Sequence, residues 1–292
     1  MRRWAALALL FVTASWGSTF FLIKNILDAH VPVLDFLAVR FTVAALALFL
    51  VFPKAVSRLP RSKLRHAGVL GLLYGVAQIL QTQGLATTPA SVSGFITGMY
   101  VVATPVFAAF LLRDRITAST WGAVLLALAG LGVLTLSGFS VGYGEALIFV
   151  AALIYALHIV GLGAWSTPAD ALGMSIVQLA VIAAICLVCT APNGVELPAD
   201  PGYWVSVLYM ALVAGALALL LQTWAQAHLP ATSSAIIMTM EPVFAAFFAV
   251  LFGGESLTVR MAFGGALVLG AMLAVELAPG RRIEGEVSHL TV

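Results

Sequence analysis

Several residues of this sequence that could do chemistry lie within long apolar runs. Gln78, Gln81 and Gln222 carry amide groups, His158 can exchange a proton near neutral pH, and Glu241 is an acid. Polar groups in apolar surroundings are costly unless they form hydrogen bonds or ion pairs. Each of these residues is therefore a candidate for substrate binding, for proton transfer or for a structural hydrogen bond.

Glu241 precedes Pro242, and the pair supports two interpretations. The carboxyl group of Glu241 could carry a proton or pair with the amino group of a substrate. It could instead be protonated or hydrogen-bonded and satisfy backbone groups that Pro242 frees, because proline cannot donate to the hydrogen bonds of a helix. The sequence leaves both interpretations open.

The amides form the clearest polar group, together with Thr82. Tyr74 precedes Gln78 by one helical turn, so the two side chains share a helix face. Tyr100 comes from a later run and is expected near the centre of the protein. These polar side chains could line a cavity, or they could hydrogen-bond neighbouring helices, as is common in lipid.

His158 lies in the middle of its run, and Tyr155 and Trp165 fall at spacings compatible with the same face. On that face His158 could hydrogen-bond a carboxylate or respond to pH, and ordinary packing is the alternative. Trp16 also lies in mid-run, where its ring could meet an apolar or aromatic substrate or pack in the core.

Arg40 is a second possible charge partner beside Glu241. Its guanidinium group could bind a carboxylate. Alternatively, its long side chain could extend to the interface between the lipid and the water on the outer side of the membrane, with Asp35 as its partner.

The composition defines the elements that position these residues. Of the 292 residues, 62% are hydrophobic and 9% are charged, whereas about 25% of the residues in soluble domains are charged. The net charge of +2 argues against a nucleic-acid partner. The sequence therefore predicts an all-α integral membrane protein whose surroundings are the lipid bilayer.

Ten apolar runs are long enough to cross a bilayer, for which roughly 20 residues suffice. The expected spans are residues 5–26, 34–53, 67–87, 91–112, 118–137, 143–164, 170–190, 203–227, 231–252 and 259–278. Turn residues such as proline and glycine separate them, and most of the loops are short. Consecutive helices are therefore expected to be antiparallel neighbours.

The distribution of basic residues predicts the orientation, because cytoplasmic loops are rich in Lys and Arg. With a cytoplasmic N-terminus, the basic loop from Lys54 to Arg65 lies inside, and the acidic loop with Glu196 and Asp200 lies outside. Further basic residues on the inside would be Arg2, Arg3, Arg113, Arg115, Arg281 and Arg282. The sequence predicts a multi-pass protein of the inner (plasma) membrane, with both termini cytoplasmic.

The two halves of the sequence resemble each other. The segment Leu80–Thr117 aligns with Leu221–Thr258, which places Gln81 on Gln222 and Pro89 on Pro230. A slightly different shift aligns Arg40 with Gln178. Residues 1–137 and 138–278 are therefore expected to be two five-helix repeats, followed by a cytoplasmic tail at 279–292. An odd number of spans inverts the second repeat, and inverted repeats place a substrate site at their interface.

Short motifs in the same order resemble the drug/metabolite transporter superfamily, EamA type. They are Trp16-Gly17-Ser18-Thr19-Phe20, Arg40-Phe41, the segment Ala90–Gly98, Glu241-Pro242-Val243-Phe244 and Gly254-Glu255-Ser256-Leu257-Thr258. Within the superfamily the chain is most similar to the YddG-type exporters of amino acids. The resemblance implies ten helices in two inverted repeats and the efflux of a small metabolite through a central cavity. Arg113-Asp114-Arg115 stands where the family often has Gly-Glu-Arg.

Other motifs give no support to catalysis. Gly138–Gly142 matches a hydrolase nucleophile motif, but it lies between helices rather than between a strand and a helix. Cys186 and Cys189 are spaced like metal or redox cysteines, yet no further ligands lie near them in the sequence, so small apolar packing residues are expected. Neither a cofactor nor a metal is expected.

Three functions follow from these patterns. The first is a secondary transporter that exports small metabolites, above all aromatic and other neutral amino acids, by alternating access and with possible proton coupling; export of other metabolites or of drugs is a variant of it. Its expected cavity residues are Trp16, Tyr74, Gln78, Gln81, Tyr100, His158, Trp165, Gln222 and Glu241. The second is an intramembrane enzyme that acts on lipid with His158 or Glu241 as a base, and the third is a structural or receptor-like subunit. The sequence favours the first.

Overall fold

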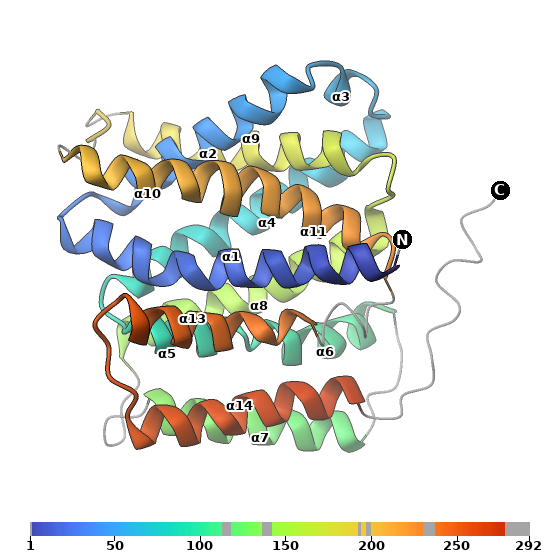
Figure 1. Cartoon of the computed structure of the whole chain (residues 1–292). Coiled ribbons are helices and arrows are strands. Elements are labelled where there is room, and N and C mark those ends of the chain that lie inside the picture. The colour runs from blue at the N-terminus through green and yellow to red at the C-terminus, as the bar shows by residue number, and fades with distance from the viewer. Residues whose placement is uncertain are drawn as a thin grey trace.

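The computed structural model describes residues 2–112, 118–135, 142–191, 194–196, 200–229 and 237–277. Every regular element in these ranges is a helix, and the long helices run side by side in one bundle (Figure 1). The expected repeat boundary at residues 137 and 138 and the expected tail lie outside the described residues.

The helices from the first part of the chain are α1 (Arg2–Asp28), α2 (Val33–Val51), α3 (Lys54–Ser57), α4 (Arg61–Leu85), α5 (Ala90–Thr97), α6 (Tyr100–Leu112) and α7 (Ala118–Thr135). Those from the second part are α8 (Tyr143–Trp165), α9 (Ala171–Thr190), α10 (Pro201–Ala211), the π-helical turn η1 (Leu212–Leu217), α11 (Ala218–Gln226), α13 (Met240–Leu251) and α14 (Val259–Leu277).

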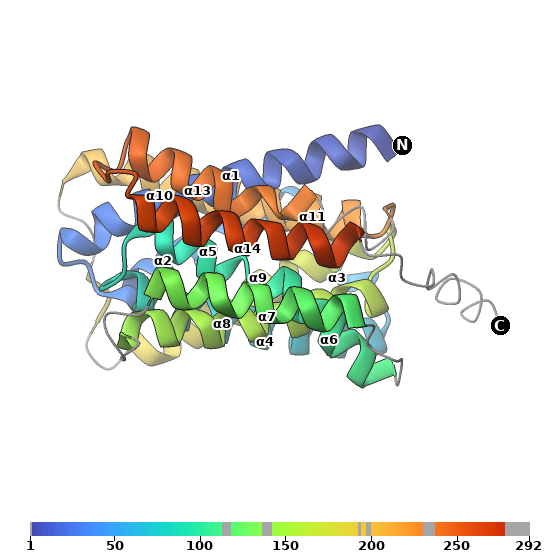
Figure 2. The ribbon, with the colours of Figure 1, turned by 90° about the horizontal axis from the view of Figure 1, so that it is seen from below.

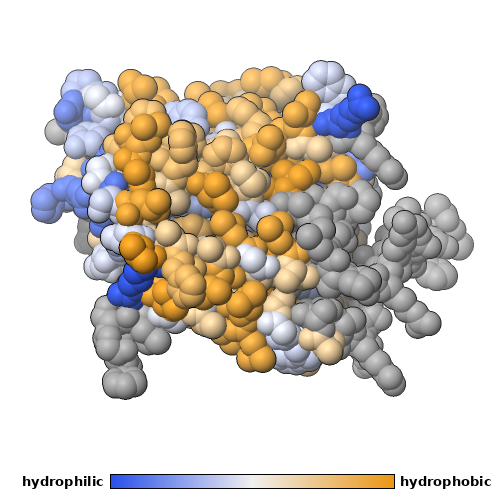
Figure 3. All heavy atoms as spheres, turned by 60° about the horizontal axis from the view of Figure 1, so that its bottom comes forward, coloured by the Kyte–Doolittle hydropathy of each residue, from blue (hydrophilic) through white to orange (hydrophobic). Residues whose placement is uncertain are grey.

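Among the described residues, six helical segments have the length and the apolar composition to cross a membrane. They are Arg3–Asp28, Val33–Val51, Ala90–Leu111, Tyr143–Trp165, Ala171–Thr190 and Pro201–Gln226. Shorter apolar helices cover Trp121–Leu134, Met240–Leu251 and Val259–Ala274. Figure 3 shows the surface: apolar side chains form a broad band, and hydrophilic side chains gather toward its edges. The predicted all-helical membrane protein is confirmed, and the total of ten spans stays a prediction.

Two of the expected spans are interrupted helices. The run at 91–112 contains α5 and α6, separated at Gly98 and Met99, where the backbone nitrogens of Met99 and Val101 bond to the oxygens of Ile96 and Gly98, each at 3.0 Å. These bonds span three residues, so the chain turns more tightly than in an α-helix. The run at 203–227 contains α10, η1 and α11, and its π-helical turn is wider than an α-helical one.

The helices pack in pairs that are distant in sequence. Helix α7 lies beside α14 (Figures 1 and 2), α2 packs on α9, α4 contacts both α8 and α9, and α1 contacts α11 and α13. Glycines permit the close approaches. A Cβ atom added to Gly17 of α1 would lie 2.6 Å from the Cβ of Phe244, and one added to Gly71 of α4 would lie 2.9 Å from the Cβ of Val181.

The charged loops lie at the two ends of the bundle. The N-terminus of α1 lies at the same end as α3 (Figure 1). Near α3, Lys63 Nζ donates to the backbone oxygen of Trp165 at 2.6 Å and lies 3.5 Å from Asp170 Oδ2. At the opposite end of α2, Asp35 Oδ2 accepts a hydrogen bond from the backbone nitrogen of Glu196 at 2.9 Å. Arg113, Arg115, Arg281 and Arg282 lie outside the described residues.

Candidate functional site

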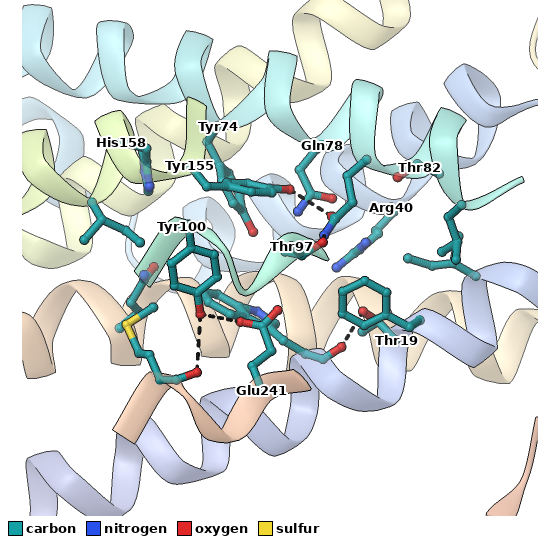
Figure 4. Close-up of a pocket in the computed structure, with 18 residues that line it drawn as sticks. Thr19, Arg40, Tyr74, Gln78, Thr82, Thr97, Tyr100, Tyr155, His158 and Glu241 are labelled. Atoms are coloured by element: carbon teal, nitrogen blue, oxygen red, sulfur yellow. Dashed lines mark hydrogen bonds between the residues drawn. The ribbon is translucent and has the colours of Figure 1, made fainter. Parts of the chain in front are cut away.

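A cavity with about 40 Å³ of free space lies between helices from both parts of the chain (Figure 4). It is lined by Trp16, Thr19, Phe20, Ile23, Arg40, Tyr74, Gln78, Gln81, Thr82, Leu85, Thr97, Tyr100, Tyr155, His158, Ile159, Gln222, Met238 and Glu241. All the predicted cavity residues except Trp165 are in this set, and so is Arg40. Rings and aliphatic groups alternate in its walls with amides, hydroxyls and two charged side chains.

The acidic part of the wall is formed by Glu241 at the start of α13. Its side chain is 4% exposed, and its Oε2 accepts a hydrogen bond from the hydroxyl of Tyr100 at 2.7 Å. The same hydroxyl lies 3.5 Å from the backbone oxygen of Met238. That oxygen is four residues before Pro242, which has no N–H to offer it. Tyr100 therefore lies near the Met238 oxygen, which has lost its helical donor at Pro242. The carboxyl group of Glu241 points into the cavity (Figure 4).

A chain of neutral hydrogen bonds crosses the cavity wall. The hydroxyl of Tyr155 on α8 donates to Gln81 Oε1 at 2.9 Å, and Gln81 Nε2 donates to Thr97 Oγ1 at 2.9 Å. Two further amide oxygens, Gln78 Oε1 and Gln222 Oε1, are buried and have no hydrogen-bond partner among the described residues. Because a buried acceptor without a donor is costly, these two oxygens are suited to receive a donor from a ligand.

Arg40 of α2 provides the positive charge of the cavity. Its side chain is 2% exposed, its Nε donates to the backbone oxygen of Met210 at 3.1 Å, and its guanidinium group points into the cavity (Figure 4). No ion pair with an acid is formed by Arg40 in the described part of the chain. The expected partnership with Asp35 is wrong, because Asp35 sits at the end of α2 and bonds to Glu196 while Arg40 is deeply buried.

Trp16 contacts the interrupted helix of the second part. Its Nε1 donates to the backbone oxygen of Ala214, inside η1, at 2.9 Å. A π-helical turn leaves carbonyl groups without the regular helical donor. Trp16 and Arg40 therefore hold carbonyls at Ala214 and Met210, on either side of the junction where α10 passes into η1.

His158 is held from two sides. Its Nε2 lies 2.8 Å from Gln178 Oε1 of α9, and its ring stacks on Tyr74 at a centroid distance of 5.1 Å. Tyr74 in turn contacts the ring of Tyr155 at 5.7 Å. His158 is thus part of an aromatic wall with its ring nitrogen bonded outward to α9, and it is only 1% exposed.

Trp165 does not join this group. It lies at the end of α8, where its ring stacks on His66 at 4.5 Å and its backbone oxygen accepts from Lys63. Trp165 shares a helix face with Tyr155 and His158, but it lies almost two helical turns beyond His158. It is therefore too far along α8 to reach the cavity.

Several lining residues were not in the set of expected cavity residues: Thr19, Phe20, Ile23, Thr82, Leu85, Thr97, Tyr155, Ile159 and Met238. Of these, the sequence groups Thr82 with the amides that could line a cavity and places Tyr155 on the face of His158. Most of these lining residues lie three or four positions before or after a predicted residue, as Thr19 and Phe20 follow Trp16 and Tyr155 precedes His158, so helical spacing could have found them. Thr97 and Met238 are equivalent positions in the alignment of Leu80–Thr117 with Leu221–Thr258. That alignment was the available signal for this pair.

Metal chemistry finds no support in the part of the chain that is described. No group of three or more His, Cys, Asp or Glu residues there could hold a metal ion. Cys186 is buried and Cys189 is exposed, and both are free thiols.

Comparisons with known proteins agree with a membrane transporter. The model of the EamA-like transporter family matches the chain twice, over residues 3–136 and 142–276. A curated protein of Archaeoglobus fulgidus, named as an uncharacterized transporter, is 32% identical over 281 residues, which cover 94% of this chain and 87% of that protein. A solved crystal structure with 18% identity has a TM-score of 0.69 over 94% of this chain and 96% of that chain, and this likeness concerns the fold alone.

The family match spans nearly the whole described chain, and the similarity to the relative extends over most of both sequences. A transporter function also accounts for a polar cavity among apolar helices. This chain therefore belongs to the EamA-like transporter family of the drug/metabolite transporter superfamily and is a multi-pass membrane transporter.

Proposed function

We propose that this protein is a secondary transporter that exports neutral amino acids, aromatic ones among them, by alternating access, as the YddG-type exporters do. The observation that carries the proposal is the cavity between the two parts of the chain, where apolar and aromatic walls meet opposite charges. An amino acid has a variable apolar end and a polar head with both charges, so such walls suit it. The proposed substrate-binding residues are the predicted cavity residues other than Trp165.

Alternating access requires two halves that can exchange roles, and we take these to be the inverted repeats 1–137 and 138–278. The two separate matches to one family model support this duplication. Equivalent positions of the repeats also face the same cavity. They are Gln81 and Gln222, Thr97 and Met238, and Tyr100 and Glu241, and the last two are hydrogen-bonded to each other.

The packing of the helices supports the same two-fold relation. If the halves exchange, α2 and α9 exchange with each other, and so do α7 and α14, and each of these pairs is in contact. The contacts of α1 with α11 and α13 correspond to those of α8 with α4, α5 and α6, which are also present. With ten spans in this arrangement, the cavity would lie close to the bilayer midplane.

The proposed direction is outward across the inner membrane, with both termini in the cytoplasm. The placement of Lys63 and Glu196 near opposite ends of α2 supports this orientation, because basic loops stay inside. Cysteines placed singly at these two positions, in a protein whose Cys186 and Cys189 are replaced by serine, test it: only the one replacing Glu196 is expected to react with a membrane-impermeant thiol reagent added outside intact cells. Labelling of both from the same side would refute the orientation and the inversion of the repeats.

The central experiment is counterflow in liposomes. Purified protein is expected to accelerate the exchange of labelled phenylalanine and methionine, and Gln81→Leu is expected to slow it because it breaks the bonds to Tyr155 and Thr97. Gln83→Leu is the matched control, since Gln83 lies on the same helix with an exposed side chain. Folded protein that carries no member of a broad amino-acid panel would refute this substrate class and favour another metabolite or a drug.

A further inference from the structure

The charged groups of the cavity are incompletely paired. Arg40 has five N–H donors, and the structure shows one bond for it, from Nε to the backbone oxygen of Met210. In the described ranges no carboxylate lies within 4.0 Å of its nitrogens. A guanidinium group that is almost fully buried without a counter-charge is costly. The guanidinium group of Arg40 points into the cavity, and an anion bound to its free N–H groups there would be the most strongly stabilised (Figure 4).

We propose that Arg40 binds the carboxylate group of the transported molecule and so selects amino acids in their zwitterionic form. This assignment rests on the proposed function and deepens it. The planar guanidinium fork matches a carboxylate with two parallel hydrogen bonds, which an amide or an ester cannot reproduce. The bond from Nε to Met210 leaves the Nη atoms for this purpose and fixes the plane of the fork.

The charge balance of the cavity favours a zwitterion over a simple anion. Glu241, the one acidic residue of the described cavity wall, also points into the space. Its carboxyl group and the unpartnered oxygens of Gln78 and Gln222 are acceptors, and an ammonium group supplies three donors. A dianion such as phosphate would leave one negative charge unmatched beside Glu241, whereas an amino acid brings one charge of each sign.

The two halves of the protein differ at the position of Arg40, and this difference fixes how a bound substrate is oriented in the cavity. Arg40 aligns with Gln178, which is not among the residues that line the cavity and whose Oε1 lies 2.8 Å from His158 Nε2. The second half thus supplies no matching cation from the equivalent position. A substrate held at Arg40 therefore has its carboxylate on the α2 side of the cavity.

The test compares three probes of one shape: phenylalanine, phenylalanine amide, which lacks the carboxylate, and 3-phenylpropanoate, which lacks the amine. Counterflow and ligand-induced thermal stabilisation of purified protein measure the preference for phenylalanine over its amide. Loss of two charge-assisted hydrogen bonds in Arg40→Gln is expected to lower this preference by about 10- to 100-fold. Arg40→Lys keeps the charge but loses the planar fork. Its preference for phenylalanine over the amide is expected to lie between those of the wild type and Arg40→Gln.

Arg260→Gln is the matched control, because Arg260 Nε also donates to a backbone oxygen, that of Val133, but lies outside the cavity lining. Its preference is expected to equal that of the wild type. If Arg40→Gln does not fold, the same preference for phenylalanine over its amide is measured in Arg40→Lys, where it is expected to be lower than in the wild type. A wild-type protein that carries amino acids but treats phenylalanine and its amide alike overturns the assignment and leaves the proposed function standing.

A wild-type protein that carries no amino acid refutes the proposed function, and the thermal-stabilisation arm still decides the role of Arg40. Stabilisation by 3-phenylpropanoate in the wild type that disappears in Arg40→Gln supports the carboxylate site. Equal stabilisation of both proteins, or of neither, overturns it.

Discussion

Helix α5 begins with a cap that comes from the other part of the chain. Glu255, in the loop after α13, accepts a hydrogen bond from the backbone nitrogen of Ala90 at 2.5 Å through Oε1. Its Oε2 accepts from the backbone nitrogen of Ser91 at 3.3 Å and from the Ser91 hydroxyl. The residue before α5 is Pro89, which offers no side-chain cap. The first N–H groups of α5 therefore depend on Glu255.

Replacement of Glu255 isolates the strength of this cap. Glu255→Gln keeps an acceptor oxygen but loses the charge that the helix N-terminus favours, so it should cost about 1 kcal/mol of stability. Glu255→Ala also leaves the N–H groups and the hydroxyl without their partner; since water reaches this partly exposed site, the expected loss is about 2 kcal/mol. These losses correspond to falls in Tm of roughly 2–4 °C and 4–8 °C.

Tryptophan fluorescence of the purified protein during heating measures these shifts in detergent. Glu145→Gln is the control, because Glu145 lies in the first turn of α8 but makes no hydrogen bond to the N–H groups of that turn in the described structure. It should lower Tm by at most about half as much as Glu255→Gln, through the helix dipole alone. Equal shifts for the two glutamine variants, or no shift for Glu255→Ala, would refute the cap.

Three further outcomes are expected. If Glu241 carries protons, Glu241→Gln removes the pH dependence of counterflow measured at two pH values while exchange continues; unchanged pH dependence would exclude that role. Trp16→Phe, which loses the bond to the Ala214 oxygen, should destabilise the protein by about 1 kcal/mol, whereas Trp4→Phe, at an exposed ring, should leave Tm unchanged. Gly17→Ala forces α1 away from α13 and should cost about 1–3 kcal/mol, while Gly68→Ala, where a Cβ meets nothing within 4 Å, should be neutral in the same melting assay.

The sequence predicted much of the cavity from two patterns, the helical spacing of its polar residues and the resemblance between its two halves. Tyr74, Gln78 and Gln81 share a face of α4 by their spacing alone, and Gln222 follows from Gln81 by the repeat. Glu241 was found because an acid inside an apolar run needs a partner. Its partner was not predicted: Tyr100 lies on another helix, and although the alignment of the halves places Tyr100 on Glu241, it does not show that the two side chains touch.

The interruptions of the long helices also escaped prediction, for a related reason. The run that forms α10, η1 and α11 is predominantly apolar and contains no proline beyond its first position, so it resembles one continuous helix. Its π-helical turn is contacted from outside, by the hydrogen bond of Trp16 to the Ala214 carbonyl within the turn and by that of Arg40 to the Met210 carbonyl at the end of α10. The cap from Glu255 to α5 is similar, since the residues that it joins are far apart in the chain.

These external contacts bear on how the proposed transporter could move. The polar bonds around the cavity repeatedly join an element of the first part to one of the second: Trp16 to Ala214, Ser18 to Tyr209, Arg40 to Met210, Tyr155 to Gln81, and Tyr100 to Glu241. A relative displacement of the halves must stretch some of these bonds in surroundings where water is scarce, and each broken bond is then costly. A ligand can shift such an equilibrium only through contacts that differ between the two states. A carboxylate on the Nη atoms of Arg40 and an ammonium group on Glu241 would be contacts of this kind, because they satisfy groups on both sides of the interface while the direct bonds between the halves are rearranged.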